Sequence, residues 1–393
     1  MSFPEPRLSS GPRIIVVGAG AVGLFAAISL LERGASVTVV EGDARAGRAG
    51  LVPRSASAAA AGMLGPYSEG LYEGPTAHRL LSKLCVAGLK AWDDRLAQSP
   101  QFDVLVRETG ALLLAHGDAD MARVLRVRDR ARNAGANFEW IDGLPDDLDP
   151  HLYSLRVRGA LRLKDERVVA VGPMLEALAD MVADLGGSVL RERSVSHLAV
   201  RNGRAMGVAL TDGSGLVSDG VVLATGALAP PALVAAAPAL QRLTPAKGIL
   251  GVVQPEASSA IQETVRTMGC YAVPGELGEI YFGSSMDMGR TDLDLEEEVL
   301  QRLFTALRAA LPGARFESRP RFHSVGLRPM SPDWAPMVGP SGPEGCFVAC
   351  GHSRNGWLLG PLTGAMIAAQ VFGGPVEDLW TAFTPDRFEK KAA

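Results

Sequence analysis

Three glycines near the start of the chain have the spacing G-x-G-x-x-G, a pattern that can hold the phosphates of a dinucleotide. They are Gly18, Gly20 and Gly23. In this pattern the first glycine permits a tight turn, the second lets the main chain approach a pyrophosphate, and the third lets a helix pack close to a strand. Glu41 follows at the distance where a carboxylate accepts hydrogen bonds from ribose hydroxyls. A carboxylate there would repel a 2′-phosphate, so the pattern favours NAD or FAD over NADP.

The elements that would position these residues form one β-α-β unit. Residues 14–17 and 37–40 are β-branched runs, and residues 21–31 form an uncharged helical stretch between them. The first helical turn, at Ala21 and Val22, would direct its free N–H groups and the positive end of its dipole toward the phosphates. A glycine-rich turn without a ligand is the alternative. Because strand, glycines, helix, strand and acid occur in this order, the dinucleotide interpretation is favoured.

The whole sequence limits the class of protein further. A chain of 393 residues, 47% of them hydrophobic, is long enough for two domains. A net charge of -4 without a basic stripe predicts no nucleic-acid partner. The apolar run 14–31 has dinucleotide spacing, which argues against a signal or membrane segment. Neither the histidines nor the cysteines (Cys85, Cys270, Cys346 and Cys350) have metal-ligand or disulfide spacing, so we expect a reduced, cytoplasmic protein without a metal.

The rest of the chain alternates helical and strand-like segments. The small-residue stretch 55–65 predicts a helix start against a cofactor, with an ordinary packed helix as the alternative. Residues 104–115 suggest a hairpin, and the arginines of a helix at 121–134 suggest a solvated face. Residues 246–325 have antiparallel-sheet character and indicate an inserted α+β domain. Further helices are expected at 77–96, 173–185, 295–311 and 361–372, and strands at 159–163, 188–190, 195–200, 205–210, 220–226, 248–254, 270–274, 279–284 and 346–350.

Five stretches, in this order, resemble the D-amino-acid oxidase superfamily and, within it, the glycine oxidases of thiamine biosynthesis. The stretches span nearly the whole chain, which makes their combination specific. They are GAGAVG with Glu41, SAAAAGMLG (57–65), ATGAL (224–228), CYAVP with FGSSM (270–286), and GLRPMSPD with GHSRNGWLLGP (326–361).

The resemblance implies a flavoenzyme with two domains. An α/β Rossmann-like FAD-binding domain would comprise residues 13–85, 155–245 and 326–390. An inserted α+β substrate domain of mostly antiparallel sheet, residues 86–154 and 246–325, would cover the flavin.

The resemblance also implies the site residues. Four positions match its substrate site: Tyr271, Met286, Arg328 and Arg354. Arginine is a suitable partner for a substrate carboxylate, since its planar fork binds bidentately. A structural ion pair, a rim position and simple packing are the alternatives for these side chains. The residues implied for FAD are Gly18, Gly20, Ala21, Val22, Gly23, Glu41, Ser57, Ala60, Ala61, Gly62, Met63, Val195, Ala224, Thr225, Gly226, Arg328, His352, Arg354, Asn355, Gly356, Trp357 and Leu358.

The function implied is FAD-dependent oxidative deamination of glycine, sarcosine or a small D-amino acid, with oxygen as acceptor and hydrogen peroxide as product. Gly326 stands where related sarcosine oxidases have a flavin-linked cysteine, so FAD is expected to be non-covalent. A dehydrogenase of a cyclic amino acid such as D-proline, with another acceptor, and a non-catalytic FAD-binding module are the alternatives. Oligomeric state is left open. The loop 42–54 and Trp357 depart from the glycine oxidase pattern.

Overall fold

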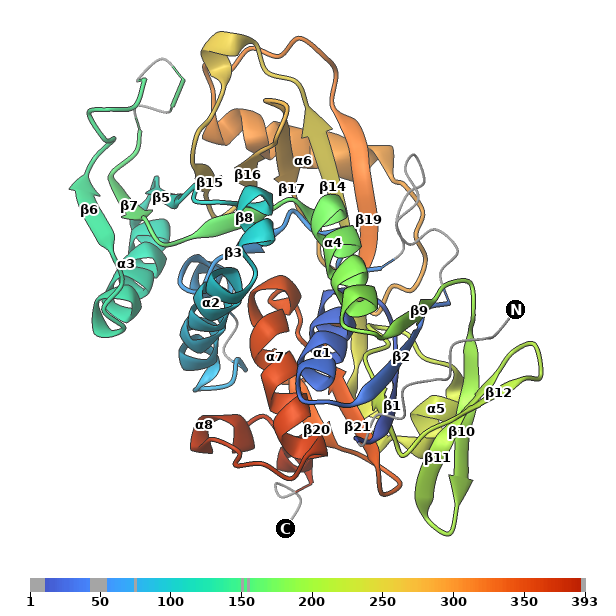
Figure 1. The fold of residues 1–393 in the computed structure, drawn as a ribbon. Helices are drawn as coiled ribbons and strands as arrows, with labels where there is room; N and C mark the ends of the chain where they lie inside the picture. Colours follow the sequence, from blue (N-terminus) through green and yellow to red (C-terminus); the bar gives the residue numbers. More distant parts are fainter. Residues whose placement is uncertain (1–10, 43–54, 74–75, 150–151, 154–155, 390–393) are drawn as a thin grey trace.

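A computed structural model describes residues 11–42, 55–73, 76–149, 152–153 and 156–389 (Figure 1). Two large sheets dominate the fold, and helices cover the first sheet and flank the second. The greater part of the expected loop 42–54 and of the expected N-terminal tail lies outside the described residues.

The first sheet contains the glycine-rich turn. It has six strands in the order β20-β21-β13-β1-β2-β9, and all neighbouring pairs except β20-β21 are parallel. Because β1 lies between β13 and β2, the turn after it opens at the carboxyl edge of the sheet, where ligands of such sheets bind. The strands are β1 (Arg13–Val17), β2 (Ser36–Val40), β9 (Ser188–Leu190), β13 (Gly220–Leu223), β20 (Met337–Pro340) and β21 (Cys346–Cys350).

Helices α1 and α7 pack closely beside this sheet (Figure 1). Two glycines of α7 make this possible. A Cβ at Gly360 would lie 2.5 Å from the Phe25 ring, and one at Gly364 would lie 2.5 Å from the Phe25 carbonyl oxygen. Helix α4 packs against α1, and α2 packs against α7. These helices are α1 (Ala21–Glu32), α2 (Leu81–Gln98), α4 (Val171–Asp184) and α7 (Gly356–Val371).

Helix α7 continues through Pro361, which cannot donate to the carbonyl four residues earlier. That carbonyl belongs to Trp357, and the indole Nε1 of Trp92 donates to it at 2.9 Å. Trp92 also packs edge-on against Phe25 at 5.3 Å. The tertiary contact therefore satisfies the acceptor that proline leaves unpaired.

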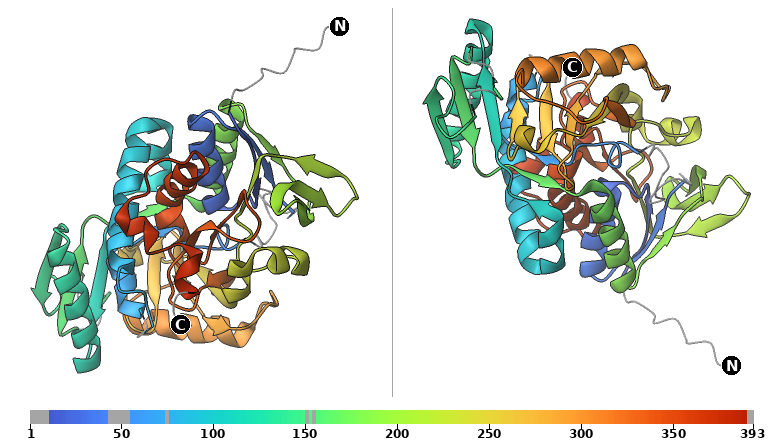
Figure 2. Two further views of the ribbon diagram at one scale, coloured as in Figure 1. Left: turned by 90° about the horizontal axis from the view of Figure 1, so that it is seen from below. Right: turned by 90° about the horizontal axis from the view of Figure 1, so that it is seen from above.

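The second sheet is mostly antiparallel and has nine strands, in the order β18-β14-β17-β16-β15-β5-β7-β6 with β19 paired to β14. Figure 2 shows helix α6 along one side of it and α3 beside its β5-β7 end. The strands are β5 (Ala111–Ala115), β6 (Phe138–Asp142), β7 (Gly159–Leu163), β14 (Thr244–Val253), β15 (Thr264–Arg266), β16 (Tyr271–Pro274), β17 (Ile280–Gly283), β18 (Asp287–Met288) and β19 (Arg321–Met330). The helices are α3 (Asp118–Asn133) and α6 (Glu297–Ala310).

Two small sheets complete the described structure. One is β10-β11-β12 and the other is β3-β8-β4. Their strands are β3 (Met63–Leu64), β4 (Val106–Arg107), β8 (Arg167–Val169), β10 (Val195–Arg201), β11 (Arg204–Leu210) and β12 (Gly215–Val217), and the two short helices are α5 (Pro231–Ala236) and α8 (Asp378–Thr381).

The expected fold class is confirmed, but two local expectations were wrong. Residues 55–60 form turns and not a helix, and Met63–Leu64 continues as strand β3 against β8. Residues 104–115 are not a hairpin, because β4 pairs with β8 whereas β5 pairs with β7 and β15. Every residue of β5 is buried, so it suits the interior of a sheet with neighbours on both sides.

The largest differences between expected and observed helix boundaries are at the starts of two helices. Helix α2 begins at Leu81, and α7 begins at Gly356. The domain boundaries remain a prediction, and the pairing of some strands crosses them. Strand β7, assigned from sequence to the FAD-binding part, pairs with β5 and β6 in the nine-stranded sheet.

Candidate active site

A cavity of about 700 Å³ lies where the two large sheets meet. Its lining combines the glycine turn after β1, the turns at 55–60, the start of α7, and strands β14, β16 and β19. All the site residues expected from sequence line it except Ala21, Asn355 and Leu358. One continuous cavity therefore brings together side chains separated by more than 300 positions.

Each of the three glycines of the motif is needed for a different structural reason. Gly18 has a φ of 110°, and a Cβ there would lie 2.4 Å from the carbonyl oxygen of Ala224. A Cβ at Gly23 would lie 2.0 Å from the Gly18 oxygen, so this glycine lets α1 approach β1. A Cβ at Gly20 would meet only the Ser57 side chain, at 3.0 Å. Gly20 is thus the one whose missing side chain leaves the wall of the cavity open.

Two side chains satisfy main-chain groups at this turn. Glu41 Oε2 accepts a hydrogen bond from the Ala19 N–H at 2.7 Å, and Ser57 Oγ accepts one from the Ala21 N–H at 3.0 Å. The indole Nε1 of Trp357 donates to the Ser57 carbonyl oxygen at 3.0 Å. The turn segment is thereby fixed between the starts of α1 and α7. Trp357, which departs from the glycine oxidase pattern, is part of this connection.

His352 lines the cavity just before α7 but is buried. Its Nε2 lies 2.9 Å from Thr363 Oγ1 on α7. Burial lowers the pKa of His352 to about 3, so the ring is neutral near pH 7. This geometry gives His352 a structural role at the start of the helix.

Arg328, on β19, lines the part of the cavity that the antiparallel sheet forms. Its Nη1 donates to the Ser285 carbonyl oxygen at 3.0 Å, and its Nη2 donates to Ser284 Oγ at 2.5 Å. The neighbouring strand contributes Gly248, where a Cβ would lie 2.1 Å from Nη1. Among the residues that the structure describes, no carboxylate forms an ion pair with Arg328. Burial lowers the pKa of its guanidinium, which still remains charged near neutral pH.

Tyr271 on β16 and Met286 line the cavity together with Arg328. Burial raises the pKa of Tyr271, even though the nearby Arg328 and a hydrogen bond with Ser284 act in the opposite direction. The phenol is therefore protonated near neutral pH and can donate a hydrogen bond. Ser284, which sequence reasoning missed, links Arg328 and Tyr271.

Arg354 is held in place by residues that sequence reasoning also missed. Its Nε lies 2.9 Å from Glu69 Oε2, and its Nη2 donates to the Glu69 carbonyl oxygen at 3.2 Å. Its guanidinium lies over the Tyr72 ring at 5.1 Å and the Trp334 ring at 5.6 Å. Arg354 is therefore a paired cation, unlike Arg328.

Glu69 also pairs with the fully buried Arg266, whose Nη1 lies 2.8 Å from Glu69 Oε1. Burial alone would raise the pKa of Glu69, but Arg354 and Arg266 outweigh it and the pKa is lowered. A second carboxylate, Glu166, accepts hydrogen bonds from the Ser68 N–H at 2.7 Å and hydroxyl at 2.5 Å. Nothing in the sequence signals this cluster, because the segments around Glu69 and Arg266 contain other polar and acidic residues that look alike in the sequence.

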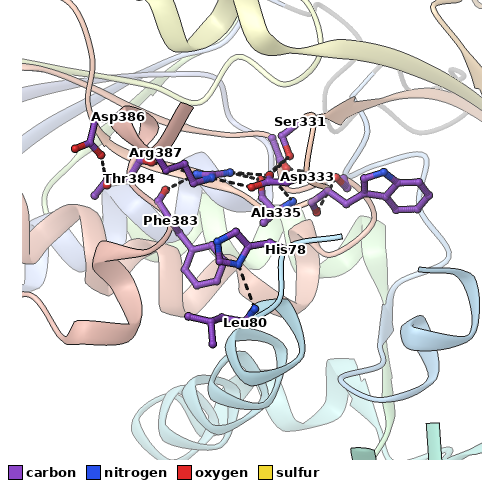
Figure 3. A network of polar contacts seen from close by, with 12 residues as sticks. His78, Leu80, Ser331, Asp333, Ala335, Phe383, Thr384, Asp386 and Arg387 are labelled. Carbon is purple, nitrogen blue, oxygen red and sulfur yellow. Dashed lines mark hydrogen bonds and ion pairs between the residues drawn. The ribbon is translucent and has the colours of Figure 1, made fainter. Parts of the chain in front are cut away.

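The segment that carries Trp334 is fixed by an ion pair (Figure 3). Arg387 contacts both carboxylate oxygens of Asp333 at 2.9 Å. Ser331 donates to the Ala335 carbonyl oxygen at 2.6 Å. The C-terminal part of the chain thus supports the ring that lies against Arg354.

The parallel sheet with its glycine turn, and the cavity between it and the antiparallel sheet, are the features expected of an oxidoreductase that uses a dinucleotide. Residues 13–370 match the sequence profile of the family described as "FAD dependent oxidoreductase". The chain belongs to this family, and FAD is its cofactor.

Known relatives match over nearly the full length. A glycine oxidase from Geobacillus kaustophilus is 27% identical over 362 residues, which are 91% of this chain and 92% of that protein. A glycine oxidase from Bacillus licheniformis is 28% identical, with 95% and 97% covered. The solved structure of the Geobacillus kaustophilus glycine oxidase superposes with a TM-score of 0.79 at 26% identity, covering 96% of this chain and 99% of that one.

The residues around the glycine turn fit FAD. Gly18 and Gly23 are required by close main-chain approaches, while Gly20 keeps the wall beside the start of α1 open. Thr225 Oγ1 is a buried hydroxyl on this wall that has no hydrogen-bond partner within the described part of the chain. A buried polar atom of this kind is expected where a ligand supplies the partner.

No helix within the described ranges has the length and apolar character needed to cross a membrane. No group of three or more His, Cys, Asp or Glu side chains with metal-binding geometry occurs among the described residues.

Proposed function

We propose that the protein oxidises the CH–NH bond of a small amino acid: glycine, sarcosine or a small D-amino acid. The observation that supports this proposal is the environment of Arg328. Its guanidinium borders the cavity, is hydrogen-bonded to neutral groups, and has no carboxylate partner within the described residues. Such a cation is a suitable partner for a substrate carboxylate.

In this proposal the side chains of the cavity bind and orient the substrate. Arg328 pairs with the carboxylate, and the protonated Tyr271 donates a second hydrogen bond to it. Met286 supplies an apolar wall beside them. When bound, FAD supplies the acceptor for the hydride that leaves the substrate Cα. Catalysis then depends on positioning and electrostatics, because His352 is buried against Thr363 and its pKa of about 3 makes it a poor general base.

In the same proposal, residues at the end of the cavity near the glycine turn hold the cofactor. Glu41 is proposed to bind the ribose, and the start of α1 the pyrophosphate. The turns at 55–60 and the start of α7 would enclose the flavin. Val195, Ala224, Thr225 and Gly226 complete the wall along the dinucleotide.

With oxygen as acceptor, the amino acid, oxygen and water give a keto acid, ammonia and hydrogen peroxide. For glycine the keto acid is glyoxylate, and for sarcosine the amine released is methylamine. The test is a peroxide assay of the FAD-loaded enzyme with glycine, sarcosine, D-alanine and D-proline. Peroxide formed with glycine or sarcosine supports the proposal. A flavin that none of these amines reduces would refute it.

A second candidate is a dehydrogenase that uses an acceptor other than oxygen. A D-amino acid dehydrogenase from Xanthobacter autotrophicus is 29% identical over 301 residues, which are 74% of this chain and 67% of that protein. Anaerobic reduction of the flavin by D-alanine or D-proline, followed by slow reoxidation in air and rapid reoxidation by a quinone, would favour this candidate.

A further inference from the structure

We propose that the substrate pocket also recognises a second anionic group, and that Arg123 on helix α3 binds it. The preferred substrate would then be an amino acid with an additional acid group, either on its side chain or on its nitrogen substituent. This inference rests on the proposed amino-acid oxidation. It concerns which member of that substrate class the pocket selects.

The cations around the cavity show why Arg123 stands out. Four arginines among the described residues line the cavity, and two of them are neutralised by acids. Arg193 pairs with Asp212, and Arg354 pairs with Glu69. Arg328 and Arg123 form no ion pair with any carboxylate that the structure describes. Arg328 is assigned to the substrate carboxylate, so a second cation remains.

Arg123 is directed toward the pocket by the segment on which α3 packs. Its Nη1 donates to the carbonyl oxygen of Leu71 at 3.3 Å. The next residue is Tyr72, whose ring lies under the Arg354 guanidinium. A guanidinium has five N–H donors, and this contact occupies one of them. No acceptor among the described residues occupies the others, which leaves them for a ligand, and the side chain is only partly exposed.

The other arginines of α3 have different surroundings. Three of them contact acids: Arg128 and Arg132 contact Asp129, and Arg130 pairs with Glu73. Arg126 is exposed and donates to the Ala122 carbonyl of its own helix. The solvated face expected from the sequence therefore describes most of this helix but not Arg123.

The charge balance of the pocket supports an anion with two groups. Within the described residues, Glu41 and Glu69 are the acids that line the cavity, and Glu41 lies at the glycine turn. Glu69 is shared between Arg354 and the buried Arg266. Glu166 also lies near Arg266, so the positive charge at the substrate end comes from Arg328 and Arg123, which have no ion-pair partner among the described residues. One substrate carboxylate offsets part of it, and a second anionic group offsets more.

Two inert ligands test this on the wild-type holoenzyme. Thiodiacetate carries two carboxylates, and methylthioacetate is its counterpart with one. Their dissociation constants are measured from the change in the flavin visible spectrum. We expect thiodiacetate to bind at least about tenfold more tightly, since a hydrogen bond to a charged partner contributes about this factor. Equal affinity for the two ligands would overturn the inference without using any variant.

Variants then assign the effect to Arg123. Arg123→Gln should reduce the preference for thiodiacetate to near unity and leave methylthioacetate unchanged. Arg126→Gln, one helical turn along and exposed, is the matched control and should preserve the preference. A preference that survives in Arg123→Gln would overturn the assignment.

Substrates distinguish the two sources of the second acid group and separate this inference from the proposed function. D-Glutamate with D-glutamine tests a side-chain acid, and iminodiacetate with sarcosine tests an acid on the nitrogen substituent. A kcat/KM advantage for either acid that Arg123→Gln removes supports the inference. Oxidation of the monoacids without such an advantage contradicts the inference alone. No flavin reduction by any of these amines contradicts the proposed function itself.

Discussion

Arg354 is bound to Glu69 at two points: its Nε lies 2.9 Å from the carboxylate, and its Nη2 donates to the main-chain oxygen of the same residue at 3.2 Å. The pair joins the start of α7 to the segment after β3. Because Glu69 also contacts buried Arg266, one carboxylate stabilises two guanidiniums from distant parts of the chain.

Glu69→Gln should therefore destabilise the protein. Removing one partner of a buried ion pair leaves an uncompensated charge at Arg266, which costs about 3 kcal/mol in the free energy of unfolding. Urea denaturation at pH 7 measures this change. Glu176→Gln, which breaks a half-exposed pair with Arg191, is the control and should cost less than about 1 kcal/mol. Similar losses in both variants would show that the Glu69 cluster is not a special contributor.

Arg328→Ala should raise KM for amino-acid substrates by about 100-fold, because the substrate carboxylate loses its charged partner. The FAD content, read from the visible spectrum, should stay at the wild-type value. Arg328→Lys keeps a charge without the planar fork and should give an intermediate KM. Near-normal steady-state kinetics of the alanine variant would contradict the assignment.

The glycines at 20 and 23 should respond differently to substitution. Gly20→Val should abolish FAD binding by blocking main-chain approach to the pyrophosphate, while the apoprotein still unfolds cooperatively. Gly23→Ala should lower apoprotein stability by about 2 kcal/mol, since its Cβ would lie 2.0 Å from the Gly18 oxygen. The ratio of flavin absorbance to protein absorbance measures the FAD content, and thermal unfolding measures the stability of the apoprotein. A Gly20→Val protein purified with full flavin content would refute the first expectation.

His352 should make stability depend on pH. Its folded pKa of about 3 lies below the ordinary value of 6.5, so the unfolded chain takes up the proton more readily. The stabilisation is complete above pH 6.5 and is lost as pH falls toward 3. Between pH 6.5 and 5 the wild type should lose about 2 kcal/mol more unfolding free energy than His352→Gln. Parallel pH dependence of the two proteins in urea titrations would contradict this.

FAD should be released by acid. Gly326 offers no side chain for a covalent bond, and a Cβ there would lie 2.6 Å from the Ala59 Cβ. Precipitation with trichloroacetic acid should give a colourless pellet and a yellow supernatant. A pellet that keeps the flavin absorbance would show a covalent link elsewhere in the chain.

Local sequence patterns determine much of the fold of this protein. The first β-α-β unit follows from β-branched runs, three glycines and a terminal acid, because these features act within about 30 residues. The family resemblance carried the expectation further, to FAD and to the positions of Arg328 and Arg354. The expectation of a helix at 55–60 was wrong because small residues suit both helices and turns. The contacts of this segment with the starts of α1 and α7 decide between the two.

Tertiary structure alone decided which charges are paired. Nothing near Glu69 in the sequence indicates that it meets Arg266, almost 200 positions later, or Arg354, almost 300 positions later. The sequence likewise does not distinguish Arg123 from the other arginines of α3, although Arg123 lines the cavity. Amphipathic patterns specify which face of a helix is polar, because they depend on local spacing. Whether a polar side chain meets solvent, an acid or a ligand depends on the packing of other elements, which local spacing does not encode.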